Sequence, residues 1–178
     1  MLDPAAVWTA RLVLAAVFAM AALSKLRALE EFVGVVHNYR VLPEPWVRAV
    51  AYALPPLEAA IALALLIEPA HGFGAVAAGA LLVVFSLAMA VNLARGRLEI
   101  DCGCFAATLR QRISWSLVGR NLVLIGLAAL AMPASAARPL SWLDAVTIVG
   151  GATGAVVLYV AFTQLRSLAL PPRPGDVR

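Results

Sequence analysis

The chain has 178 residues, of which 63% are hydrophobic and only 13% are charged, and its mean hydropathy is +0.91. Soluble domains are about half apolar and about one quarter charged, so this composition excludes an ordinary soluble domain and predicts an integral membrane protein. The net charge of +4 and the pI of about 9.7 do not indicate nucleic-acid binding. The basic residues lie in short loops beside apolar runs, and no basic stripe interleaved with aromatic residues is present in the sequence.

Five apolar segments can be read in chain order, at residues 5–24, 49–67, 72–94, 116–136 and 143–164. Each is close to the ~20 residues that a helix needs to cross a bilayer. We therefore expect an all-α membrane protein with a bundle of four core transmembrane helices and a fifth. It forms a single domain over residues 1–166, followed by a disordered tail at 167–178. Asp3 stands where a signal peptide would have basic residues, so the first segment is expected to remain as a span.

The stretch after the first segment, "LRALEEFVGVVHNYR" at residues 26–40, is amphipathic. Its apolar residues recur at helical spacing: Leu26, Leu29, Phe32, Val33 and Val36. This pattern predicts a short helix that lies at the membrane interface.

Lysine and arginine are unevenly distributed between the two sides of the predicted spans. With five spans, eleven of these residues fall on one side and two on the other. The positive-inside rule then places the N-terminus outside and the loop between the third and fourth spans in the cytoplasm, for a protein of the bacterial inner membrane. The eleven are Lys25, Arg27, Arg40, Arg48, Arg95, Arg97, Arg110, Arg112, Arg166, Arg173 and Arg178, and the two are Arg11 and Arg138.

The two cysteines of the chain, Cys102 and Cys104, lie in that loop, within "GRLEIDCGCFAATLRQR". A disulfide across the single residue between them, Gly103, would close a very small ring and be easily reduced, and glycine has the backbone freedom to allow it. The spacing therefore favours a dithiol that alternates between thiols and a disulfide. The carboxylate of Asp101 disfavours the thiolate of its neighbour Cys102, so Cys104 is the expected attacking thiolate and Cys102 the resolving thiol.

Other interpretations of the cysteines stay open. Two thiolates could hold a soft metal ion such as Cu(I) or Hg(II). A closed zinc site needs about four ligands, and only His37, His71 and carboxylates could supply the rest, with His71 at the opposite membrane face. The cysteines could also be small hydrophobic residues without a chemical role. The chain could also be a non-catalytic scaffold that holds a partner.

Several polar residues interrupt the apolar segments at the end of the bundle that carries the cysteines. Ionisable groups inside a membrane are costly, so they face the bundle interior and find partners. Together with the loop they predict a polar pocket beneath the cysteines, although hydrogen bonds and one ion pair of Glu58 with Lys25 or Arg120 could instead only lock the helices together. The predicted pocket residues are Lys25, Glu58, Asn92, Asp101, Arg120 and Asn121.

Five stretches of the chain form a recognisable set: "FAMAALSKL", "NYRVLP", "LPPLEAAIAL", "VNLARGRLEIDCGCF" and "RISWSLVGRN". With them the chain resembles the MauE branch of the DoxX-like membrane proteins, named from methylamine utilisation, over roughly residues 8–130. The Cys-Gly-Cys-Phe block after an Asn-containing third span is the most specific part of the resemblance. The family pattern often has glycine after this Phe, where the present sequence has Ala106.

This resemblance implies an inner-membrane protein of thiol–disulfide chemistry, with Cys102 and Cys104 as the redox pair and a thioredoxin-like or other thiol protein as partner. Relatives are associated with maturation of the disulfide-rich small subunit of methylamine dehydrogenase. Disulfide formation outside the cytoplasm conflicts with cytoplasmic cysteines. Either the orientation differs, or the partner is cytoplasmic, or a quinone carries the electrons onward. No other cofactor is indicated, and the sequence does not indicate the oligomeric state.

Overall fold

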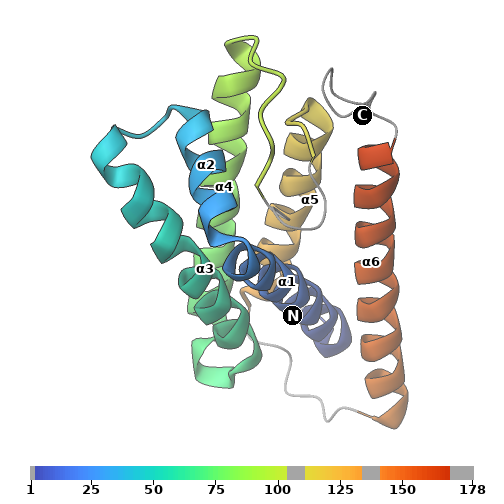
Figure 1. Ribbon diagram of the computed structural model, residues 1–178. Coiled ribbons are helices and arrows are strands. Elements are labelled where there is room, and N and C mark those ends of the chain that lie inside the picture. The colour runs from blue at the N-terminus through green and yellow to red at the C-terminus, as the bar shows by residue number, and fades with distance from the viewer. Residues whose placement is uncertain (1–2, 104–110, 134–140, 169–178) are drawn as a thin grey trace.

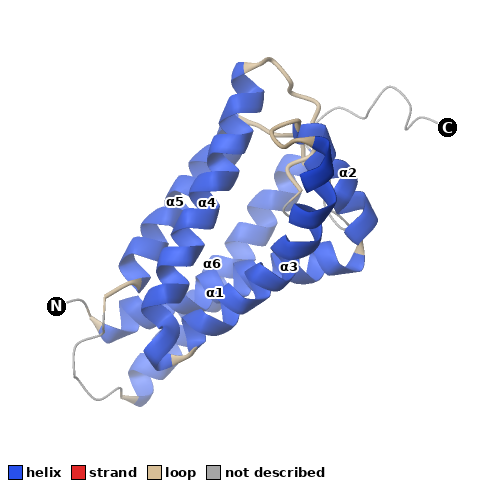
Figure 2. Ribbon diagram, turned by 90° about the vertical axis from the view of Figure 1, so that its left-hand side faces the viewer, coloured by secondary structure: helices blue, strands red, loops and turns tan. Residues whose placement is uncertain are grey.

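The computed structural model describes residues 3–103, 111–133 and 141–168, and these residues form a bundle of helices joined by loops (Figures 1 and 2). Among the described residues, Asp101 and Arg112 form one antiparallel β-bridge, and all other regular structure is helical. The expected all-helical membrane bundle is confirmed. The elements are α1 (Pro4–Arg27), α2 (Leu29–Tyr39), α3 (Glu44–Leu66), the 3-10 turn η1 (Glu68–Ala70), α4 (His71–Ala94), α5 (Trp115–Ala131) and α6 (Trp142–Leu168).

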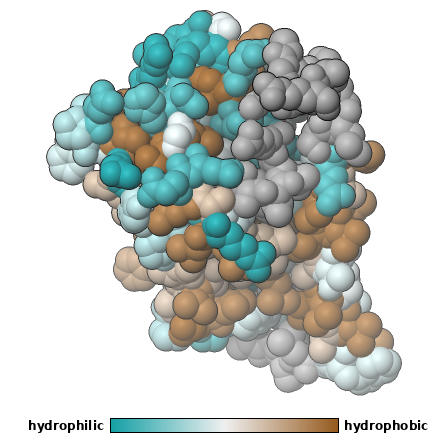
Figure 3. Space-filling model, in the orientation of Figure 1, coloured by the Kyte–Doolittle hydropathy of each residue, from teal (hydrophilic) through white to brown (hydrophobic). Residues whose placement is uncertain are grey.

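Four of the helical segments are long and apolar enough to cross a membrane: α1, α3, η1 with α4, and α6. Helix α5 is also apolar but has only 17 residues. These elements coincide with the five apolar segments of the sequence. Large hydrophobic side chains are exposed on the outer faces of α3, α4, α5 and α6, whereas hydrophilic residues gather at the end that carries α2 (Figure 3). That division fits a lipid-facing belt with a polar cap.

Helix α1 is the centre of the bundle, because it packs against α3, α5 and α6, and α4 closes the bundle against α3 and α5. A helix that is apolar on all sides is stable only when it is surrounded, and Val7, Leu14 and Phe18 of α1 are accordingly buried. The helix begins where Asp3 Oδ1 accepts a hydrogen bond of 2.8 Å from the amide of Ala5, with Pro4 in the first turn.

The amphipathic stretch forms α2, but this helix begins at Leu29, because α1 continues through Arg27. Leu26 therefore belongs to α1 and is exposed instead of lying on the apolar face of α2, and Phe32 is the buried residue of α2. On the outer side of α2, Glu30 accepts hydrogen bonds from the Tyr52 hydroxyl (2.6 Å) and from Arg48 (3.2 Å) of α3. The Tyr52 hydrogen bond and the Arg48 guanidinium lower the pKa of Glu30.

Arg11, one of the two basic residues counted on the side opposite the cysteine loop, is buried and forms an ion pair. It lies inside α1 with its side chain 0% exposed, and its Nη1 is 2.8 Å from Glu68 Oε1 in η1. The guanidinium also sits over the ring of Trp8, with 5.0 Å to the centroid. His71 is near the same carboxylate, at 3.5 Å. This ion-pair cluster therefore closes the end of the bundle where α1 begins.

Candidate functional site

The cysteine loop leaves α4, folds back on itself and returns to α5. Its two sides are joined by hydrogen bonds from the amide of Cys102 to the carbonyl of Gln111 (2.6 Å) and from the amide of Ile113 to the carbonyl of Ile100 (2.9 Å). Asp101 and Arg112 form the antiparallel bridge between them. Cys104 lies in the connecting segment, outside the described residues. The backbone of Cys102 is thus held in place directly before the glycine.

The side chain of Cys102 is half-buried beside Met89 of α4. The hydroxyl of Tyr39, the last residue of α2, donates a hydrogen bond of 3.2 Å to the Cys102 carbonyl. The Sγ atom of Cys102 lies 3.8 Å from the Sδ atom of Met89. A small buried cluster of Met89, Leu93, Ile100, Ile113 and Leu117 supports the loop from below. Cys102 therefore rests on an apolar base and faces α2 and α4.

At Gly103 the structure requires glycine for two reasons. Its φ is +78°, in the region that residues with a Cβ atom rarely adopt. A Cβ atom at this position would also lie 2.8 Å from Val35 Cγ1 and 3.3 Å from Phe32 Cε2. The glycine of the Cys-Gly-Cys sequence thus allows the loop to press directly onto α2.

Two polar side chains tie the loop to the rest of the bundle. Arg97 donates hydrogen bonds to Asn92 Oδ1 (2.9 Å) and to the carbonyls of Asn38 (2.9 Å) and Tyr39 (3.4 Å) at the end of α2. Gln111 is buried and donates to the carbonyl of Thr163 in α6, at 2.5 Å. These contacts fix both sides of the loop, one against α2 and α4 and the other against α6.

Lys25 and Glu58, two of the six residues expected to form a polar pocket, are in direct contact. Lys25 Nζ and Glu58 Oε1 are 2.5 Å apart, and the two side chains are 2% and 1% exposed. The Lys25 ammonium also lies 5.3 Å from the ring centroid of Phe32 and 5.6 Å from that of Phe85. A buried charge needs this kind of partner, since an isolated one would cost several kcal/mol.

The other expected pocket residues make contacts of their own. Asn92 is fully buried and accepts from Arg97, and Asp101 belongs to the β-bridge. Arg120 of α5 lies over the ring of Tyr159 in α6, at 5.1 Å to the centroid. Asn121 is buried, and its Nδ2 has no hydrogen-bond partner among the described residues. Of the predicted set, Lys25 is the one that lines the cavity beneath the loop.

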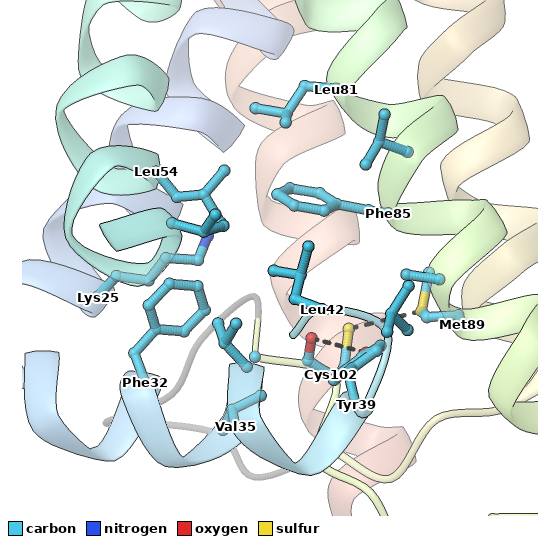
Figure 4. A pocket seen from close by; sticks show the side chains of 16 residues that line it. Lys25, Phe32, Val35, Tyr39, Leu42, Leu54, Leu81, Phe85, Met89 and Cys102 are labelled. Atoms are coloured by element: carbon cyan, nitrogen blue, oxygen red, sulfur yellow. Dashed lines mark hydrogen bonds between the residues drawn. The ribbon is translucent and has the colours of Figure 1, made fainter. Parts of the chain in front are cut away.

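That cavity is largely apolar and has a volume of about 210 Å³. Its walls come from α2, α3, α4 and the loop, and Figure 4 shows Phe85, Leu54 and Phe32 facing it. Lys25 lies at one side of the cavity, and Cys102, Tyr39 and Met89 lie at the other (Figure 4). The site therefore combines an apolar chamber with one ammonium and one thiol in its wall.

Sequence reasoning missed most of this chamber. Phe85 and Leu54 are ordinary members of apolar spans, and nothing in their spacing separates a cavity wall from a lipid-facing surface. Nothing in the sequence likewise marks Met89 or Gln111 as part of the site. In the sequence, Arg97 counts only among the basic residues that indicate membrane orientation, whereas in the structure it holds the loop to α2. Within the described ranges, no group of three or more His, Cys, Asp or Glu side chains is placed to hold a metal ion.

Residues 3–134 match the family described as "Methylamine utilisation protein MauE". The chain belongs to the MauE family. It is 48% identical over 171 residues to the methylamine utilization protein MauE of Paracoccus denitrificans, covering 95% of this chain and 91% of the relative. The MauE protein of Paracoccus versutus is 48% identical over 175 residues, covering 96% and 91%. The MauE protein of Methylorubrum extorquens is 43% identical over 141 residues, covering 77% and 76%.

No solved structure matches this chain. The family and the four helices long enough to cross a membrane together identify a multi-pass membrane protein. The MauE family match ends at residue 134 and so covers the cysteine loop and the cavity but not α6.

Proposed function

We propose that this MauE-family chain is a membrane thiol–disulfide redox protein that uses Cys102 and Cys104. The observation that carries the proposal is the placement of Cys102 at the end of the bundle. Its backbone is fixed by the hydrogen bond to the Gln111 carbonyl. The next residue, Gly103, has a positive φ and packs so closely against α2 that a side chain would not fit. A fixed thiol beside a second thiol suits repeated formation and cleavage of one disulfide.

The two thiols have different tasks in this proposal. Cys104 attacks a disulfide of the partner and forms a mixed disulfide, releasing one partner thiolate. Cys102 then attacks Cys104 Sγ, which closes the Cys102–Cys104 disulfide and releases the second partner thiolate, so two electrons have moved to the partner. The reverse sequence oxidises a dithiol partner. The half-buried position of Cys102 against Met89 supports its role as the resolving thiol, because a protected thiol is poorly placed to meet another protein.

Membership of the MauE family supports a proposal for the pathway and the partner. Relatives with 43–48% identity are named for methylamine utilisation. We therefore propose an accessory role in methylamine utilisation, in which a thioredoxin-like protein exchanges electrons with the cysteines during maturation of a disulfide-rich partner such as the methylamine dehydrogenase small subunit. The membrane is the bacterial inner membrane.

The proposed orientation places the N-terminus outside and the cysteine loop in the cytoplasm. It is supported by the excess of lysine and arginine on the side of the loop, eleven against two. In intact cells treated with a permeant reductant, a membrane-impermeant maleimide should label neither cysteine until the cells are lysed. Strong labelling before lysis would reverse the orientation.

Trapping of the mixed disulfide tests the redox proposal. Cys102→Ser and Cys104→Ser are made separately, cells are quenched in acid, and the proteins are separated on non-reducing gels. Cys102→Ser should accumulate a dithiothreitol-sensitive adduct with the partner, because the resolving thiol is missing, whereas Cys104→Ser should form none. If neither variant forms an adduct and the double variant supports normal methylamine growth, the chain acts as a scaffold without thiol chemistry.

Soft-metal binding is a second candidate function, and one contact favours it. The Sγ atom of Cys102 and the Sδ atom of Met89 are 3.8 Å apart, and thiolate and thioether sulfurs are the ligands that select Cu(I). Competition of the purified protein with a chromogenic Cu(I) chelator measures its affinity for Cu(I). A Met89→Leu variant should then bind Cu(I) at least tenfold more weakly, while equal binding by the variant removes the support for this function.

A further inference from the structure

The cavity beneath the cysteine loop has the size and lining of a site for a planar, lipid-soluble molecule. Its volume is about 210 Å³, and an apolar cavity of about 150 Å³ is large enough to bind benzene. Val41, Leu42 and Val84 line it and are themselves exposed large hydrophobic residues. A ligand can therefore reach the cavity from the lipid, past side chains of α4 and of the segment between α2 and α3.

Aromatic rings and an ammonium define what the cavity can recognise. Phe32 and Phe85 flank Lys25 at 5.3 and 5.6 Å from its Nζ, and both rings belong to the cavity wall. Aromatic rings favour stacking with a planar ring. An ammonium carries three N–H donors, so Lys25 can donate to a ligand carbonyl as well as to Glu58. The lining thus suits a flat ring that bears carbonyl oxygens.

A thiol borders the same cavity. Cys102 and Gly103 line it from the loop, and Figure 4 shows Cys102 opposite Lys25. The redox function proposed above leaves the cysteine pair reduced after it has oxidised a dithiol partner, and an electron acceptor must then reoxidise the pair. A lipid-soluble acceptor in this cavity would lie beside one of the two thiols.

We propose that the cavity between α2, α3 and α4 binds the ring of an isoprenoid quinone that accepts two electrons from the cysteine pair. This inference rests on the redox function proposed above. In the step, the thiols of Cys102 and Cys104 lose two electrons and two protons and form their S–S bond. The quinone gains both electrons and both protons and leaves as the quinol. The Lys25 ammonium stabilises the negative charge that develops on the carbonyl oxygen next to it.

A phospholipid acyl chain is the competing occupant. It would fill the apolar volume, but it has no acceptor for the Lys25 ammonium and no means of accepting electrons from the thiols. A quinone would interact with every part of the lining: the apolar wall, the rings of Phe32 and Phe85, the Lys25 ammonium and the Cys102 thiol.

The test uses the full chain in phospholipid nanodiscs, with decylubiquinone as the oxidant and a photoreactive azidoquinone as the binding probe. After reduction and desalting, the protein should convert one decylubiquinone to the quinol and lose both maleimide-reactive thiols. Peptide mapping should find the azidoquinone on α2 and α4, and excess decylubiquinone should displace it. Ala88→Phe places a ring in the cavity and should reduce labelling at least tenfold.

Leu87→Phe is the matched control, because Leu87 is the exposed neighbour on the same helix and does not line the cavity. If Ala88→Phe does not give a monodisperse protein, Leu54→Phe with the exposed Leu57→Phe as its control replaces the pair. Equal labelling of cavity and control variants overturns the inference, as does a bound phospholipid that the quinone does not displace. Thiols that glutathione disulfide oxidises but decylubiquinone does not also overturn it, while leaving the redox function intact. Thiols that neither oxidant converts overturn the redox function itself.

Discussion

At Gly103, two physical constraints act on one residue. The positive φ of +78° alone would favour glycine, and the contact with Val35 and Phe32 excludes any side chain. The spacing of the cysteines predicted the need for backbone freedom, because the turn between them is so short. It could not predict the close approach to α2, since Val35 is far away in the sequence and its position depends on how α2 packs.

Gly103→Ala should release the loop from α2. The left-handed conformation costs an alanine roughly 1–2 kcal/mol, and the Cβ atom would additionally collide with Val35 Cγ1 at 2.8 Å. Hydrogen exchange at the amide of Cys102 should accelerate, and thiol exchange with the partner should fall at least tenfold. Gly96→Ala is the control, because Gly96 has a similar φ of +72° but no atom within 4 Å of an added Cβ. Equal effects of the two substitutions would show that the contact with α2 does not matter.

Between helices, the ion pair of Lys25 and Glu58 joins α1 to α3 within the apolar bundle. The sequence identified Glu58 as a buried carboxylate that needs a cation, and it offered Lys25 and Arg120 as partners. The structure places Lys25 against Glu58 because α1 continues one turn beyond its expected end and turns Lys25 inward. Which of the two cations pairs with Glu58 depends on the length and rotation of the helices, and apolar runs define helix ends only to within a few residues.

Removing one member of this pair should destabilise the bundle strongly. Lys25→Met or Glu58→Leu alone leaves an unpaired buried charge, with an expected cost of about 3–5 kcal/mol. The double substitution removes both charges and should recover most of the lost stability, and Glu58→Gln should be milder than Glu58→Leu because it keeps a hydrogen-bond acceptor. The stability of each variant is measured by heating the protein and determining the folded fraction by gel filtration. Additive losses in the double variant would show that the two side chains are not coupled.

For the whole molecule, composition and periodicity predict the class and the helices well. Apolar runs near the thickness of a bilayer leave few alternatives to a helical bundle, and the expected spans coincide with α1, α3, α4, α5 and α6. The cavity beneath the loop was not predictable in this way. It arises where α2, α3 and α4 diverge under the cysteine loop, and its wall residues resemble lipid-facing ones in sequence.

A redox titration of the purified protein shows directly whether Cys102 and Cys104 form a reversible disulfide. The full chain is equilibrated in glutathione buffers of increasing oxidising strength, quenched in acid, alkylated with maleimide and weighed by intact mass spectrometry. Cys102 and Cys104 should pass together from two alkylated thiols to one internal disulfide, in a single two-electron transition. Each single Cys→Ser variant should show only alkylated or glutathione-bound protein. Two thiols that remain fully alkylated in every buffer would show that the cysteine pair does not act as a redox centre.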